Sequence, residues 1–84
     1  MKPQHVRLFV KTGCGWCRDA SQWLDAKGIR YDRIDVTSNR AGRQEMLQLS
    51  GQTLAPVLQA DGRILADFDT GQLTTFWRQF EQES

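Results

Sequence analysis

Two cysteines, Cys14 and Cys17, are the residues best suited to chemistry in this chain, and its 84 residues contain no other cysteine. At this spacing their sulfur atoms can form a disulfide, or the second thiol can displace a group bonded to the first. An apolar run, Val6–Val10, precedes the pair, and a helix-like pattern begins at Gly15. We therefore expect the pair at the junction of a buried strand and a helix, and we interpret it as a redox site.

Cys14 is expected at the N-cap position of the helix, and this position favours a reactive thiol. The first turn of a helix has unpaired N–H groups and the positive end of the helix dipole, and both stabilise a thiolate. Such surroundings lower the pKa of a cysteine thiol. Gly13 and Gly15 leave the Cys14 sulfur accessible, whereas Cys17 should lie one turn further in and be more shielded. Cys14 is therefore the predicted attacking thiol.

The pair has two other interpretations. A structural zinc site needs about four ligands, and His5 is the only histidine that could join the cysteines. Two unreactive buried cysteines are the other alternative, because a free cysteine packs like a small apolar residue. The glycines on both sides of Cys14 argue against burial, and the ligand count argues against a metal site.

Composition indicates one small domain covering residues 1–84. Apolar residues make up 39% of the chain, and the net charge of +1 gives no reason to expect nucleic acid or a membrane surface as a partner. The apolar run near the start is too short for a signal peptide or a membrane span. We expect a cytoplasmic monomer, and in that compartment a lone CxxC pair is more often catalytic than structural.

Hydrophobic periodicity predicts the element order β-α-β-α-β-β-α. The sequence Asp61-Gly62 between two short apolar runs indicates a hairpin, and Asp69 is a suitable N-cap for the last helix. Because CxxC follows the first strand of a βαβ unit, the predicted class is α/β with a thioredoxin-like fold. We expect strands over residues 6–10, 29–36, 57–60 and 63–66, helices over residues 15–27 and about 40–50, and a last helix with Leu73, Phe76, Trp77 and Phe80 on one face.

Several short motifs occur in an order and spacing typical of one family. They are Lys11 three residues before Cys14, Cys14-Gly15-Trp16-Cys17, Gly28-Ile29-Arg30-Tyr31, Ile34-Asp35-Val36, Ser50-Gly51-Gln52, and Pro56 before the hairpin. On these motifs the chain resembles a glutaredoxin over nearly its whole length. The resemblance implies a four-stranded mixed sheet flanked by three helices. It also implies thiol–disulfide exchange, with no tightly bound cofactor and with glutathione as the usual electron donor and co-substrate.

The resemblance assigns roles around the cysteines. Cys14 would be the nucleophile and Cys17 the resolving thiol. Lys11 would stabilise the thiolate and reach a carboxylate of glutathione, and Trp16 would shape the substrate groove. Disulfide-bearing or glutathionylated proteins would be the partners.

The same resemblance assigns the remaining glutathione contacts. Arg43 matches a position that contacts the glycyl carboxylate, and Asp69 matches the carboxylate that receives the γ-glutamyl amine. Pro56 matches a proline that is cis in thioredoxin-like folds. Ala55 would offer its backbone N–H and C=O to an extended substrate, as an added strand does.

The chain departs from the family pattern at three places. Leu54-Ala55-Pro56 replaces the usual Thr-Val-Pro, Asp67 stands where glycine is usual, and Gly15-Trp16 replaces Pro-Tyr. We therefore expect weakened glutathione binding. Two alternatives remain: a thioredoxin-like electron carrier reduced by a flavoprotein reductase, and an iron–sulfur cluster held between two subunits by the first cysteine and glutathione.

Overall fold

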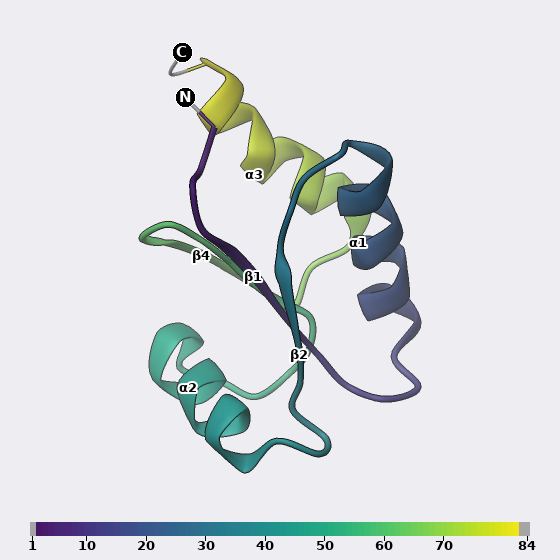
Figure 1. The fold of residues 1–84 in the computed structure, drawn as a ribbon, viewed down its shortest axis with the longest axis vertical. Helices are drawn as coiled ribbons and strands as arrows, with labels where there is room; N and C mark the ends of the chain where they lie inside the picture. The colour runs from purple at the N-terminus through teal and green to yellow at the C-terminus, as the bar shows by residue number, and fades with distance from the viewer. Residues whose placement is uncertain (1, 83–84) are drawn as a thin grey trace.

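The computed structural model describes residues 2–82 of the chain. Four strands form one mixed sheet in the order β2-β1-β3-β4, and three helices flank it (Figure 1). The predicted fold class and element order are confirmed. The elements are β1 (Val6–Val10), α1 (Gly15–Ala26), β2 (Asp32–Asp35), α2 (Arg40–Ser50), β3 (Val57–Ala60), β4 (Arg63–Ala66) and α3 (Thr70–Gln82).

β1 is an inner strand, and its pairing with β2 and β3 determines which loops lie next to the cysteines. It pairs in parallel with β2, where Val10 aligns with Asp35, and antiparallel with β3, where Phe9 aligns with Val57. The carboxyl end of β1 therefore meets the end of β2 on one side and the start of β3 on the other. The loops that follow β1 and precede β3 emerge at the same end of the sheet.

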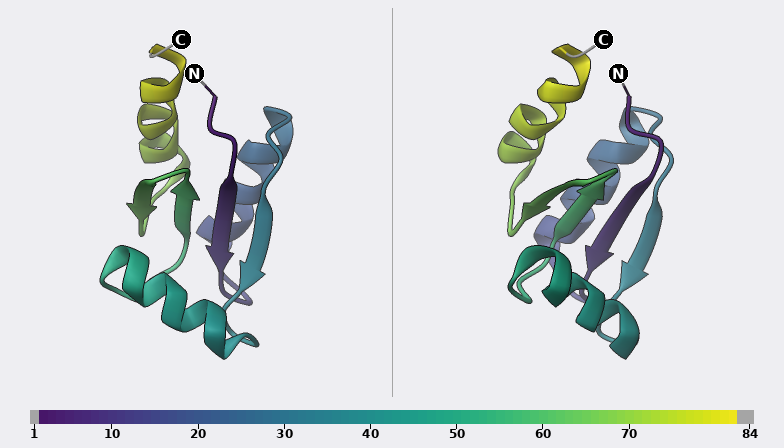
Figure 2. Two further views of the ribbon diagram at one scale, coloured as in Figure 1. Left: turned by 60° about the vertical axis from the view of Figure 1, so that its left-hand side comes forward. Right: turned by 90° about the vertical axis from the view of Figure 1, so that its left-hand side faces the viewer.

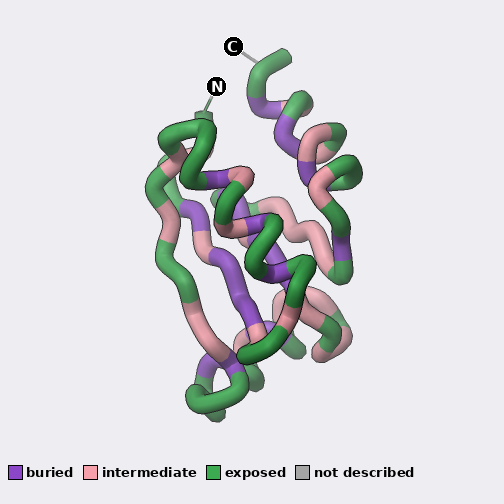
Figure 3. Tube along the Cα trace, turned by 90° about the vertical axis from the view of Figure 1, so that its right-hand side faces the viewer, coloured by how far each residue is buried: buried purple, intermediate pink, exposed green. Residues whose placement is uncertain are grey.

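Alternation along β1 divides the core between the two faces of the sheet. Leu8 and Val10 belong to the cluster that includes buried residues of α1 and α3, whereas Phe9 packs with Met46 of α2. Figures 1 and 2 show α1 and α3 lying together and α2 apart from them. Buried residues gather along the middle of the sheet and recur at intervals along the helices (Figure 3).

The predicted boundaries are confirmed for β1, β3, β4 and α2, and helix caps explain where the helices begin. Asn39 caps α2 by accepting a hydrogen bond of 2.9 Å from Gly42 N–H. Asp69 Oδ1 accepts from Gln72 N–H at 2.8 Å, and Gln72 Oε1 accepts from Asp69 N–H at 3.0 Å. This reciprocal pair is a capping box.

The predicted start of the second strand was wrong. The strand was expected from residue 29, but β2 begins at Asp32. Gly28 has a left-handed φ of 70° and donates to Asp25 C=O, and Ile29 N–H donates to Leu24 C=O, both at 3.0 Å. These bonds form a Schellman motif, so Ile29 serves to end α1 and is unavailable to the sheet.

Within residues 2–82, the helices are too short or too polar to cross a lipid bilayer.

Candidate redox-active site

Cys14 and Cys17 form a disulfide, with their Cα atoms 5.2 Å apart. Cys14 is the N-cap of α1, in an extended conformation with φ of −89° and ψ of 113°, and its sulfur accepts a hydrogen bond of 3.1 Å from Cys17 N–H. Cys14 is partly exposed, whereas Cys17 is 2% exposed. The predicted cap position of Cys14 and the shielding of Cys17 are both confirmed.

This geometry favours a thiolate at Cys14 once the disulfide is reduced. A negative sulfur at the N-cap would keep the hydrogen bond from Cys17 N–H and face the positive end of the α1 dipole. Charge-assisted hydrogen bonds of this kind stabilise the anion more than the neutral thiol, which lowers the pKa of a cysteine. Cys17 provides the backbone donor, while its own sulfur lies in the core.

The turn before Cys14 is fixed to the end of β2 by side-chain hydrogen bonds. Thr12 Oγ1 donates to Asp35 Oδ2 at 2.9 Å, and Thr12 N–H donates to Thr37 Oγ1 at 3.0 Å. Thr37 N–H in turn donates to Asp35 Oδ1 at 2.9 Å. The bond from Thr37 N–H, and then that from Thr12, hold the pKa of Asp35 below its usual value. The charged carboxylate is therefore the form that holds this turn.

A cavity of about 340 Å³ opens against the cysteines, on the side of β2. Three cations line it, each from a different element: Lys11 from the turn after β1, Arg18 from α1 and Arg33 from β2. Arg33 is aligned with Leu8, so it lies on the same face of the sheet as α1. We call this cavity the basic groove; its lining residues are Lys11, Thr12, Gly13, Cys14, Cys17, Arg18, Ser21 and Arg33.

The sequence predicted Lys11 in this site but missed the two arginines. Arg18 directly follows Cys17, and that adjacency was the available signal. Arg33 lies sixteen positions beyond Cys17 by sequence number, and it reaches the groove only because β2 pairs with β1. No local pattern identifies such a residue.

The loop before β3 approaches the same end of the sheet from the other side. The Ala55–Pro56 peptide bond is cis, as predicted, and Pro56 is buried. Pro56 C=O accepts a hydrogen bond of 2.8 Å from Asp67 N–H. Leu54 is 57% exposed, and Trp16 beside Cys14 is 51% exposed. Large apolar side chains are thus exposed at Trp16, in the first turn of α1, and at Leu54, in the loop that carries the cis proline.

Arg43 and Asp69 do not line the basic groove. Arg43 lies exposed on α2, and its side chain has no hydrogen bond or ion pair among the described residues. Asp69 caps α3 and lines a separate open hollow together with Leu65 and Phe76. The glutathione contacts assigned to Arg43 and Asp69 remain predictions.

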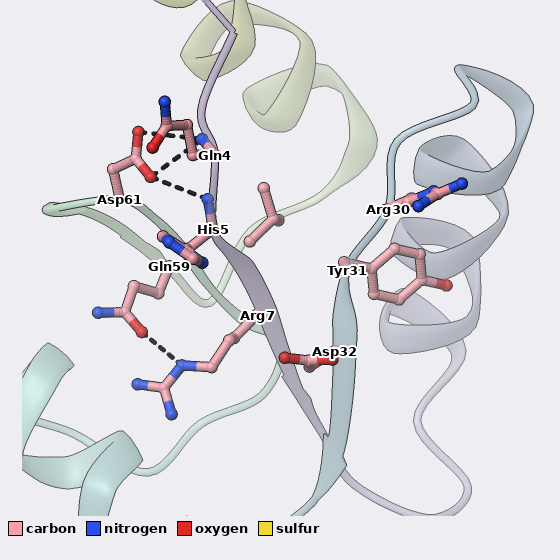
Figure 4. Close-up of a pocket in the computed structure, with 9 residues that line it drawn as sticks. Gln4, His5, Arg7, Arg30, Tyr31, Asp32, Gln59 and Asp61 are labelled. Carbon is pink, nitrogen blue, oxygen red and sulfur yellow. Dashed lines mark hydrogen bonds between the residues drawn. The ribbon is translucent and has the colours of Figure 1, made fainter.

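Another hollow, of about 470 Å³, lies at the opposite end of β1 (Figure 4). Asp61 accepts hydrogen bonds there from the N–H groups of Gln4, at 3.1 Å, and His5, at 2.9 Å. Arg7 Nε donates to Gln59 at 2.7 Å and the same guanidinium pairs with Glu45 at 2.7 Å. These bonds tie the amino-terminal segment and β1 to neighbouring elements, so we assign this hollow a structural role.

The residues from 2 to 82 contain no cluster of three or more His, Cys, Asp or Glu side chains arranged to hold a metal ion.

A CxxC disulfide at the start of the first helix, beside a cis-proline loop, on a four-stranded mixed sheet defines a thioredoxin-fold thiol–disulfide oxidoreductase. Residues 6–65 match the family model described as glutaredoxin. The chain therefore belongs to the glutaredoxin family, as its sequence motifs predicted.

Three comparisons illustrate the similarity. The chain is 29% identical over 65 residues to glutaredoxin 3 of Escherichia coli strain K12, covering 77% of this chain and 78% of that protein. It is 28% identical to buckwheat glutaredoxin in a crystal structure of its glutathione complex, with a TM-score of 0.62, covering 73% of this chain and 58% of that one. NrdH-redoxin from Escherichia coli superposes with a TM-score of 0.72 over 86% of this chain and 93% of that one; at 17% identity this likeness concerns the fold.

Proposed function

We propose that this protein reduces protein disulfides or glutathione mixed disulfides through the Cys14–Cys17 dithiol. The observation that carries the proposal is the asymmetry of the pair. Cys14 is partly exposed at a helix N-cap with its sulfur hydrogen-bonded by a backbone N–H, and Cys17 is buried behind it. One thiol is thereby suited to attack a substrate, and the other to resolve the product.

The reaction proceeds by two displacements. The Cys14 thiolate attacks one sulfur of the substrate disulfide, whose S–S bond breaks, and the other substrate sulfur leaves as a thiolate that takes up a proton. Cys17 then loses its proton and attacks the Cys14 sulfur. This step releases the second substrate thiolate, which is protonated, and forms the Cys14–Cys17 disulfide. Two electrons pass from the dithiol to the substrate, and the structure with its disulfide corresponds to the oxidised product.

We favour glutathione as the electron donor. Two glutathione thiols reduce the Cys14–Cys17 disulfide by the same exchange in reverse and leave as oxidised glutathione. Support comes from buckwheat glutaredoxin, which was crystallised with glutathione. Further support comes from Lys11 beside the cysteines and from the cis-proline loop at the same end of the sheet.

A flavoprotein reductase is the second candidate donor. The observation in its favour is Leu54, an apolar side chain 57% exposed where glutaredoxins usually have threonine. Leucine in place of threonine removes a hydroxyl from the part of the site assigned to glutathione. Its exposed side chain presents an apolar surface suited to a protein partner. NrdH-redoxin, of the same fold, is described as a glutaredoxin-like protein with a thioredoxin-like activity profile.

Parallel turnover assays separate the two donors. Reduction of bis(2-hydroxyethyl) disulfide is followed through NADPH oxidation, once with glutathione and glutathione reductase and once with thioredoxin reductase. Cys14→Ser serves as the inactive control in both. Turnover only in the glutathione assay supports the favoured donor, and turnover only with thioredoxin reductase assigns the second. No turnover in either assay, together with no reaction of the reduced protein with the disulfide, refutes the proposed function.

A further inference from the structure

The basic groove beside the cysteines has an unbalanced charge. Among residues 2–82, the side chains of Lys11, Arg18 and Arg33 form no ion pair or hydrogen bond. None of the described residues that line the groove carries a carboxylate. The whole chain has a net charge of only +1, so the excess of cations is local to this groove.

Hydrogen bonds place the Asp35 carboxylate at the edge of the groove, beside Thr12. It accepts hydrogen bonds from Thr12 Oγ1 and Thr37 N–H, and it attracts Arg33 without forming an ion pair with it. Asp35 therefore serves the turn before Cys14 and offsets only part of the positive charge. A concave surface lined by charges of one sign concentrates the electrostatic field and attracts ligands of the opposite sign.

The groove lies on the side of the cysteines away from the cis-proline loop. In the sheet order β2-β1-β3-β4, the groove residue Arg33 is on β2, whereas Pro56 leads into β3. Of the residues assigned to glutathione, only Lys11 lines the groove. A ligand in the groove would thus extend from Cys14 in a different direction from glutathione held at the cis-proline loop.

We propose that the basic groove binds an acidic segment that flanks the disulfide of a protein substrate. This inference rests on the proposed disulfide reductase function and adds to it the class of substrate. Cys14 and Cys17 both line the groove, so the residues next to a substrate cysteine that is bonded to Cys14 would lie beside it. Carboxylates on residues next to the substrate cysteine would lie against Lys11, Arg18 and Arg33.

The test uses pre-reduced protein without glutathione or a reductase, so that the electron donor does not enter. Two peptides carry the same internal disulfide and differ only in the flanking residues, Glu-Glu in one and Gln-Gln in the other. The second-order rate constant for oxidation of the protein is followed by tryptophan fluorescence in single turnover. We expect the acidic peptide to react about fivefold to tenfold faster at low salt, as for two or three exposed ion pairs. The preference should shrink in 1 M salt, because salt screens exposed charges.

Matched arginine variants locate the effect. Arg33→Gln and Arg18→Gln should each lower the acidic-to-neutral ratio about twofold to threefold. Arg78→Gln changes an exposed arginine of α3 outside the groove and should preserve the ratio.

The remaining outcomes overturn either the acidic-segment assignment or the proposed reductase function. Equal rates for the two peptides, or an equal fall of the ratio in Arg78→Gln, overturn the acidic-segment assignment and leave the reductase function in place. If neither peptide oxidises the reduced protein, the proposed function fails, and the inference fails with it.

Discussion

The carboxylate of Asp35, at the end of β2, accepts a hydrogen bond of 2.9 Å from the hydroxyl of Thr12, in the turn that leads to Cys14. The same carboxylate accepts Thr37 N–H, and the Thr37 hydroxyl accepts Thr12 N–H. These bonds join the turn before the cysteines to the chain segment after β2. The placement of Cys14 at the cap of α1 therefore depends on a side chain that takes no part in the exchange itself.

Replacing Asp35 by alanine should loosen the turn before Cys14. The variant leaves Thr37 N–H and the Thr12 hydroxyl without their acceptor, so the backbone there should open more often. Hydrogen exchange should show faster exchange at the amides of Thr12 and Thr37. Asp32→Ala removes an exposed carboxylate from the same strand and is the control; equal acceleration in both variants would contradict this role for Asp35.

The contribution of Asp35 should depend on pH in a defined direction. Hydrogen bonds from Thr37 N–H and Thr12 lower the pKa of Asp35 in the folded state relative to the unfolded state. The stabilisation is therefore complete above the unfolded pKa and is lost as the pH falls through the folded pKa. The difference in unfolding free energy between the wild type and Asp35→Ala should be constant near neutral pH and shrink in acid. A difference that persists in strong acid would show that the charge is not responsible.

In the reduced protein, Cys14 should be alkylated well before Cys17 near neutral pH. Cys14 is partly exposed and its sulfur faces the Cys17 N–H and the α1 dipole, whereas Cys17 is 2% exposed. Mass spectrometry of peptides after brief iodoacetamide treatment measures the two rates. Cys17→Ser should still form a mixed disulfide at Cys14, and Cys14→Ser should lose exchange altogether. Equal alkylation, or faster alkylation of Cys17, would reverse the assignment of roles.

Local patterns were sufficient to predict most of the fold. The Asp61-Gly62 turn indicated the hairpin, and the helix expected over about residues 40–50 ends in the structure at Gly51, which has a φ of 74°. The cap position of Cys14 followed from a strand next to a helical pattern. The start of β2 was predicted wrongly because an apolar residue such as Ile29 is equally suited to a strand and to the end of a helix. In the structure, the Ile29 N–H donates to Leu24 C=O at the end of α1 and so cannot pair with a strand.

Local sequence patterns could not predict which residues from different elements the sheet brings together. Arg33 falls within the strand expected over residues 29–36, but its place beside Cys14 depends on the pairing of β1 with β2. Gly42 falls within the helix expected over residues 40–50, and the structure shows it buried where α2 approaches β2. Both features depend on contacts between elements, for which a single sequence contains no local signal.

Gly42→Ala should destabilise the fold. A Cβ at this position would lie 2.7 Å from Ile34 Cγ2 and 3.3 Å from Asn39 Cγ, so the Ile34 side chain or the backbone of α2 or β2 must shift. Overpacking of this kind reduces the free energy of unfolding by about 1–3 kcal/mol, although alanine is the better helix former. Urea denaturation measures the change. Gly62→Ala, where a Cβ would meet nothing within 4 Å, is the control and should be near neutral; a Gly42→Ala protein as stable as the wild type would refute the close approach.

Asp67→Gly should strengthen glutathione binding without lowering stability. Asp67 is exposed, has a left-handed φ of 51°, and bonds through its backbone N–H to Pro56 C=O at 2.8 Å. Glycine adopts this φ without strain and keeps the backbone bond. Loss of the carboxylate removes repulsion of an anionic tripeptide near the cis-proline loop.

For exposed charges, the loss of this repulsion corresponds to up to about a fivefold lower KM for glutathione at low salt, with little change at high salt. Asp67→Ala separates the two effects of the substitution. It also lacks the charge, so its KM should fall as far, but its Cβ at a positive φ should reduce stability by about 1 kcal/mol relative to glycine. KM values from the reductase-coupled assay and urea midpoints for both variants decide the matter. If neither variant lowers the KM, Asp67 does not face the bound glutathione. The expected weakening of glutathione binding would then be assigned to Leu54, which replaces the usual threonine.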